Sequence, residues 1–195
     1  MRIVPKGSVL SRIRLKDLAI VDKSLPFIIT DALDKWPSTE AGGDREWTLG
    51  NLMSRPETLR SMVVPVEFFG NYMSSEMQQL QVEIGDLFNF FHKEEMDTED
   101  HAGSGMTIDH LYLAQYELKN LPELEADCGS IPDALLGTVG RGLMQKSNIW
   151  LGKKGVMSPA HIDPFFNLFC QIKGHKRIIL FPNDVGQKFL YPATG

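Results

Sequence analysis

Several features that would assign this chain to a class at once are scarce or absent. It has two cysteines, Cys128 and Cys170, which form neither a disulfide framework nor a Cys-x-x-Cys motif, so we expect a reducing compartment. No apolar stretch approaches the roughly 18 residues that a membrane-spanning helix needs. The N-terminal residues also lack the apolar core of a signal peptide. These absences predict a soluble protein inside the cell, in the cytoplasm or the nucleus.

A basic excess is also absent. The 195 residues carry a formal net charge of −5, which argues against a protein whose main role is to cover nucleic-acid phosphates. Hydrophobic residues make up 43% of the chain and charged residues 23%, values typical of a chain that folds around a core. The length suggests one domain, or one domain with an arm.

The first hundred residues predict a mixture of helices and strands. Strands are predicted at 25–30, as a buried strand, and at 62–70, where Pro65 disfavours a central position in a sheet. A helix is predicted within 48–53, where the first residue is a threonine that can cap it. Apolar residues at helical spacing predict a second helix over the latter half of 79–95.

The second half of the chain has a different pattern. The polar and acidic run 94–106 predicts a surface loop, and 109–118 predicts a strand. From Ser147 onward, short apolar segments alternate with turn residues, which indicates antiparallel strands with turns at 153–155 and 173–174.

A His-x-Asp pair lies in this β-patterned region. Residues i and i+2 of a strand point to the same face, so His161 and Asp163 can offer an imidazole nitrogen and a carboxylate oxygen to one ion. A second histidine would complete a facial triad suited to Fe(II). A lone pair of this kind is more often structural. His92 and Glu94 have the same spacing but fall on a predicted helix, where they diverge by about 200° and cannot chelate together.

The residues around this pair favour a site. A proline follows Asp163 and restricts the chain there, and Asn167 comes four residues later. Lys176 lies across the predicted turn at 173–174, and strand alternation groups it with inward apolar residues. An inward lysine needs a buried anion as partner. The alternative is a lysine at a strand edge, exposed to water.

These residues belong to a longer pattern. The chain contains W-x-G-x2-G-x2-S-P-x-H-x-D-x3-N-x3-Q-x2-G-x-K-x3-L-F within 150–192, Tyr-Leu-Ala-Gln at 112–115, and Leu-Pro-Phe-Ile followed by Trp-Pro near its start. It thereby resembles the jumonji-C (JmjC) class of Fe(II)/2-oxoglutarate oxygenases, which is cupin-like. It is similar to the small hydroxylase branch that includes the asparaginyl hydroxylase of hypoxia-inducible factor and the JmjC arginyl hydroxylases. The resemblance covers about residues 25–195.

The resemblance implies a set of roles. Two Fe(II) ligands are implied, His161 and Asp163. Residues that hold 2-oxoglutarate are implied at Lys176, which would pair with its distal carboxylate, and at Asn167, Ser158 and Tyr112. Residues on the substrate side are implied at Gln115 and Trp150. Alternatives remain open, because Tyr112 and Trp150 also suit core packing and Gln115 suits a surface amide.

The resemblance also implies a fold, which is mixed α+β. An N-terminal α/β region (1–108) would precede the first half of a double-stranded β-helix, or jelly roll (109–195). The family's third iron ligand is a second histidine on a later strand. His175 neighbours Lys176 and faces the other way, while His101 and His110 lie upstream without a family counterpart. We therefore interpret the chain as truncated, with the third ligand outside it. Unpaired sheet edges would then favour pairing with a second chain, for instance as a homodimer.

The implied function is an oxygenase that decarboxylates 2-oxoglutarate to succinate with O2 and hydroxylates a protein side chain. Histone lysine demethylation and tRNA hydroxylation are alternatives, the second disfavoured by the acidic charge. An inactive JmjC-like binding module is another alternative, since the third ligand is missing. A cupin-like isomerase or storage barrel would leave Ser158, Asn167 and Lys176 without a common role.

Overall fold

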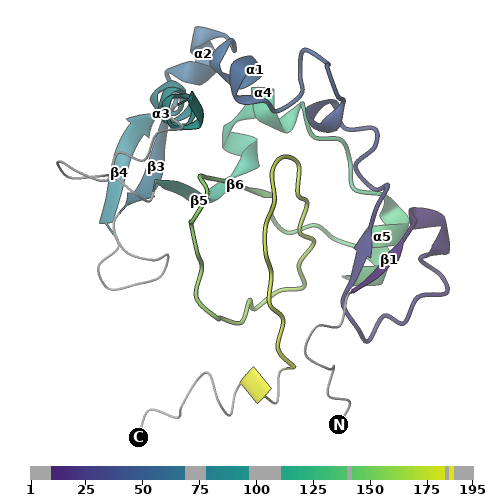
Figure 1. Cartoon of the computed structure of the whole chain (residues 1–195). Helices are drawn as coiled ribbons and strands as arrows, with labels where there is room; N and C mark the ends of the chain where they lie inside the picture. Colours follow the sequence, from purple (N-terminus) through teal and green to yellow (C-terminus); the bar gives the residue numbers. More distant parts are fainter. Residues whose placement is uncertain (1–9, 69–77, 97–110, 140–141, 183–184, 187–195) are drawn as a thin grey trace, which may run out of the picture.

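The computed structural model describes residues 10–68, 78–96, 111–139, 142–182 and 185–186 (Figure 1). The strands are β1 (Ser11–Ile13), β2 (Phe27–Ile29), β3 (Val63–Phe68), β4 (Gln78–Glu83), β5 (Tyr112–Glu117) and β6 (Asn148–Gly152). The α-helices are α1 (Leu49–Met53), α2 (Glu57–Arg60), α3 (Ile84–Met96), α4 (Pro122–Glu125) and α5 (Asp133–Val139). Short 3-10 helices are η1 (Leu15–Asp17), η2 (Pro37–Thr39) and η3 (Leu118–Asn120).

Four strands form an antiparallel sheet in the order β4-β3-β5-β6. Val64 and Val66 of β3 are completely buried, as is Leu113 of β5, so these positions define the core face of the sheet. Helix α3 covers the core with Ile84, Leu87, Phe88 and Phe91, which recur every three or four residues as one helical stripe requires. In Figure 1, α1, α2 and α3 lie together beside β3 and β4.

The two predicted helices are confirmed. The first, α1, begins after Thr48, whose Oγ1 accepts a hydrogen bond from the backbone N–H of Asn51 at 3.2 Å. The second, α3, occupies the latter half of the predicted segment, while β4 occupies the first part. His92 lies inside α3, so the His-x-Glu spacing there is helical, as predicted.

Two predictions about strand environment are wrong. The strand at 62–70 forms as β3 but is an inner strand of the sheet, despite Pro65. Among the described residues, β3 pairs with β5 at Glu67 and Tyr112. This pair lies two residues beyond Pro65, which cannot donate a hydrogen bond to a neighbouring strand. The strand at 25–30 forms as β2, but Ile28 is exposed. Among the residues that the structure describes, it pairs with the short parallel β1 and with no other strand, and no second layer covers it.

The strands predicted downstream of β6 do not form. The structure describes all of residues 153–182, and this segment contains no strand (Figure 1). The turns are in place, since Gly155 and Gly174 have φ values of 98° and 75°, which glycine adopts without strain. A β-ladder needs a hydrogen-bonded neighbour. Within the described residues, this segment runs alongside no strand that supplies one.

The sheet contains strands from both sides of the predicted boundary between 1–108 and 109–195, and that boundary stays a prediction. Of the predicted loop at 94–106, residues 97–106 lie outside the described residues. Both cysteines are free thiols, and burial raises the pKa of Cys128 to about 11 and also raises that of Cys170. Among the described residues, no helix combines the length and apolar character that crossing a bilayer requires.

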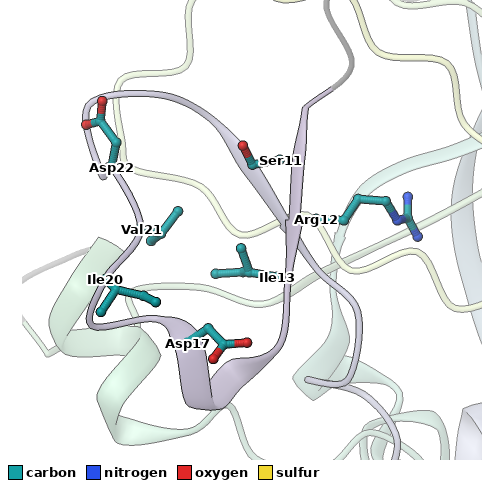
Figure 2. Close-up of a pocket in the computed structure, with 7 residues that line it drawn as sticks. All are labelled: Ser11, Arg12, Ile13, Asp17, Ile20, Val21 and Asp22. Carbon is teal, nitrogen blue, oxygen red and sulfur yellow. The ribbon is translucent and has the colours of Figure 1, made fainter.

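A hollow of about 420 Å³ lies at the small sheet, away from the residues of the His-x-Asp pattern. It is lined by Ser11, Arg12, Ile13, Asp17, Ile20, Val21 and Asp22. Figure 2 shows the Arg12 side chain directed away from the other residues of the lining. The walls of this hollow are exposed and combine polar with apolar side chains. We therefore interpret it as a shallow surface depression between β1 and the following loop.

Candidate functional site

The face of the sheet opposite the core carries polar and aromatic side chains. Glu67, Tyr112 and Gly152 are neighbours in one row across β3, β5 and β6. Residues in register point to the same face, so Glu67 and Tyr112 share it, and Trp150 joins them two residues before Gly152. The Tyr112 and Trp150 rings are 5.6 Å apart between centroids, tilted by 42°. Both aromatics therefore belong to this second face.

Gly152 makes room for Tyr112. A Cβ atom at residue 152 would lie 2.7 Å from Cδ2 of the Tyr112 ring, closer than van der Waals contact permits. The ring consequently lies flat over the neighbouring strand, and Tyr112 is 7% exposed. Packing thus explains why the W-x-G pattern has a glycine at residue 152, because any side chain there would displace the Tyr112 ring.

Lys176 reaches the same face. Its Nζ lies 5.4 Å from the centroid of the Tyr112 ring, within the range of a cation–π contact. The prediction that Lys176 points inward with apolar neighbours is wrong, because the lysine is exposed and so is Ile178. Alternation buries a side chain only where a second layer covers one face of a strand, and the described residues provide none here. Lys176 and Tyr112, both implied as 2-oxoglutarate residues, are neighbours here, and their roles stay a prediction.

His161, Asp163 and Asn167 form a second group. Nε2 of His161 lies 3.4 Å from Oδ1 of Asp163, and Asn167 donates from Nδ2 to Oδ2 of Asp163 at 3.0 Å. Nδ1 of His161 lies 2.7 Å from the carbonyl oxygen of Pro159. A carbonyl only accepts, so Nδ1 is the donor in this contact and Nε2 is the ring nitrogen that faces the carboxylate.

This donor set fits a divalent metal ion. Nε2 of His161 and Oδ1 of Asp163 are close enough to share one ion, and each ligand residue is oriented by a further hydrogen bond, as metal ligands usually are. Within the described part of the chain, no group of three His, Cys, Asp or Glu residues could hold an ion, so these two are a partial set. His101 and His110 lie outside the described residues.

The remaining predicted residues occupy different surroundings. Ser158 is half-buried and lies just before His161, where the chain has left β6. Gln115 is exposed and has a φ of 52°, a left-handed conformation that is uncommon for glutamine. The register of β5 against β6 shifts between Leu113 and Tyr116, so Gln115 lies in a β-bulge. Bulges of this kind commonly redirect side chains beside functional sites.

Sequence reasoning missed Glu67. Its Oε2 is buried and finds no hydrogen-bond partner among the described residues, and burial raises the pKa of its carboxyl group. The signal was present in the strand alternation, since Val64 and Val66 alternate with Glu67 and place it on the face opposite the core. A half-buried carboxyl group whose Oε2 has no hydrogen-bond partner among the described residues, beside Tyr112, is a candidate for contact with a ligand.

Comparisons with known proteins identify the family of the chain. The sequence profile of the family described as the cupin-like domain matches residues 15–194. The chain belongs to this cupin-like domain family. It is 34% identical over 171 residues to Jumonji C domain-containing protein 5 of Drosophila melanogaster, covering 86% of this chain and 38% of that protein.

Two further relatives are demethylases by name. The chain is 32% identical over 174 residues to Lysine-specific demethylase 8 of Danio rerio, covering 88% of this chain and 38% of that protein. It is 32% identical over 170 residues to Lysine-specific demethylase JMJ30 of Arabidopsis thaliana, covering 87% of this chain and 35% of that protein. The chain therefore spans little more than a third of the length of these cupin-like relatives.

Proposed function

We propose that this cupin-like chain contributes to an Fe(II)- and 2-oxoglutarate-dependent oxygenase that hydroxylates a protein side chain. The observation that carries the proposal is the close approach of His161 Nε2 to Asp163 Oδ1, with His161 Nδ1 engaged at the Pro159 carbonyl oxygen. When bound, iron and 2-oxoglutarate would activate O2, which would supply the oxidising power for the reaction. The assignment to the small hydroxylase branch rests on the sequence pattern.

The protein's own groups have separable tasks in this proposal. His161 and Asp163 hold the metal, and Asn167 orients Asp163 by its hydrogen bond while its remaining polar atoms reach 2-oxoglutarate. Lys176 pairs with the distal carboxylate of 2-oxoglutarate. Its ammonium group already lies over the ring of Tyr112, which the resemblance assigns to the same co-substrate. The Tyr112 hydroxyl and Ser158 donate further hydrogen bonds to the same carboxylate.

The substrate side is formed by Trp150, Gln115 and Glu67. A partly buried carboxylate suits a substrate side chain that is cationic or donates hydrogen bonds, because its desolvation is then offset by pairing. Lysine demethylation is the second candidate, favoured by the names of two relatives, and it too starts with hydroxylation at an N-methyl group. A tRNA substrate fits the chain's net charge of −5 poorly.

Succinate release from 2-oxoglutarate, with Fe(II) and ascorbate present, tests the proposal. We expect His161→Ala and Asp163→Ala to reduce turnover to background, since each removes a metal ligand. Lys176→Ala should mainly raise the 2-oxoglutarate concentration required. His92→Ala is the matched control, because the same His-x-acid spacing on α3 cannot chelate, and its turnover should equal wild type.

Two outcomes would contradict the assignment. Wild-type succinate release no higher than that of His161→Ala would favour the inactive binding module. An unchanged 2-oxoglutarate requirement in Lys176→Ala would remove the ion-pair role of this lysine.

A further inference from the structure

The turn between the metal ligands and Lys176 is attached to the N-terminal half of the chain. Nζ of Lys173 lies 2.8 Å from Oε1 of Glu46, 127 residues away in sequence. The neighbouring Ile172 packs against the hydrophobic core. Gly174, with its positive φ, then reverses the chain toward Lys176. Figure 1 shows this turn at the tip of a long loop that reaches up to the helices.

Glu46 is itself firmly held. Its Oε2 accepts a hydrogen bond from the backbone N–H of Gly42 at 2.9 Å, so both carboxylate oxygens are engaged and the side chain is only 17% exposed. The hydrogen bond from Lys173 lowers the pKa of Glu46, followed in effect by the bond from Gly42. Glu46 therefore stays ionised at neutral pH and presents a fixed negative charge to the turn.

The residues on either side of Glu46 fix its position further. Arg45 and Trp47 both hydrogen-bond to the carboxylate of Asp127, which is completely buried, at 2.6 and 2.9 Å. Trp47 is also part of the hydrophobic core. Glu46 thus stands between two anchored neighbours, and the turn binds to a rigid part of the molecule.

We propose that Glu46 is a positioning residue: through Lys173 it holds the turn so that Lys176 stands over Tyr112. This inference rests on the proposed function, because the benefit of that placement is a preformed binding site for the distal carboxylate of 2-oxoglutarate. Lys173 precedes Lys176 by three residues across the Gly174 turn, so a displacement of the turn moves the lysine directly. Neither Glu46 nor Lys173 touches 2-oxoglutarate in this arrangement.

Charge reversal in the full 195-residue chain tests the proposal. We expect Glu46→Lys and Lys173→Glu each to raise the dissociation constant for 2-oxoglutarate, measured calorimetrically with Mn(II) in place of iron, by about fivefold. The double variant should regain most of the lost affinity, because it restores an opposite-charge pair. The milder Lys173→Gln should show the same direction with a smaller change.

Arg14→Glu is the matched control. Arg14 pairs with Asp31 at 3.1 Å, the exposures of the two side chains (63% and 19%) resemble those of Lys173 and Glu46 (56% and 17%), and Asp31 likewise accepts a backbone N–H, from Leu15. This variant should lose an equivalent surface ion pair without changing 2-oxoglutarate affinity. A change as large as that of Lys173→Glu would show that the effect is general destabilisation.

Amide hydrogen exchange of residues 170–176 tests the positioning role of Glu46 separately from the proposed oxygenase function. Faster exchange in each single variant, reversed in the double variant, is expected if Glu46 holds the turn, whether or not 2-oxoglutarate binds. Unchanged exchange, or a double variant as weak as the singles, would overturn the positioning role. Wild-type protein that binds no 2-oxoglutarate, yet shows this exchange pattern, would overturn the proposed function and leave Glu46 as an anchor of the turn only.

Discussion

At the scale of single residues, Glu67 stands out because its environment opposes its charge. Burial raises the pKa of its carboxyl group above the ordinary value of 4.5, and Oε2 has no hydrogen-bond partner among the described residues. In the proposed function, a substrate group that reaches the Tyr112 face of the sheet would pair with this carboxylate.

The stability of a Glu67→Gln variant tests this view. A raised pKa in the folded state means that ionised Glu67 destabilises the fold, so stability falls as pH rises from about 4.5 through the folded pKa. We expect Glu67→Gln to be more stable than wild type at pH 7. The difference should vanish near pH 4, where the wild-type carboxyl group is protonated. Urea unfolding at both pH values measures it, and equal stabilities at pH 7 would refute the argument.

At the scale of elements, Asp127 connects parts of the chain that are distant in sequence. Arg45 and Trp47 precede α1, Arg55 follows it, and all three donate to the Asp127 carboxylate just beyond α4. The distance from Arg55 to Oδ2 is 2.7 Å, and Arg55 is 12% exposed while Asp127 is fully buried. Three donors satisfy a carboxylate that would otherwise be unstable in the interior.

Replacing Asp127 should be severe. Asp127→Ala leaves the partly buried Arg55 guanidinium unpaired and Trp47 Nε1 without its acceptor, so we expect a loss of about 3–5 kcal/mol in unfolding free energy. Asp34→Ala, at an exposed aspartate, should change stability by less than about 0.5 kcal/mol. Denaturant unfolding followed by tryptophan fluorescence provides the comparison. A loss below about 1 kcal/mol would mean that the network contributes little.

The sequence predicted those elements whose signal is local. Helix α3 follows from its apolar period, and α1 from the threonine that caps it, because both depend on residues within a few positions. The strands downstream of β6 were predicted from alternation alone. Strand formation depends on a partner, and alternation does not reveal whether one is adjacent. The inner position of β3 likewise depends on its pairing with β5 at Glu67, away from Pro65, which no local rule anticipates.

In the candidate site, too, local features were predictable from the sequence and features created by distant contacts were not. The His161–Asp163–Asn167 group was predictable because its members lie within seven residues and interact locally. Glu67 was missed because its importance comes from Tyr112, a neighbour created by strand pairing. The Glu46–Lys173 contact spans 127 residues and left no signal in either local sequence.

At the scale of the whole molecule, the segment 157–181 exposes apolar side chains. Large hydrophobic residues there are between 49% and 83% exposed, namely Met157, Ile162, Phe165, Phe166, Phe169, Ile178, Ile179, Leu180 and Phe181. Among the described residues, no strand pairs with this segment. Contiguous apolar surface with unpaired backbone promotes association with other polypeptides. We therefore expect the 195-residue chain to self-associate as its concentration rises.

The double substitution Phe165→Ser and Phe166→Ser should weaken this association, because it removes the two most exposed rings of the segment, at 69% and 83%. Ile20→Ser is the control: Ile20 is equally exposed, at 85%, but lies at the small sheet far from this segment in sequence. Sedimentation velocity across a concentration series measures the association. If both variants and the wild type associate alike, segment 157–181 is not the contact surface. If the double variant alone stays monomeric, the Phe165 and Phe166 rings drive the self-association.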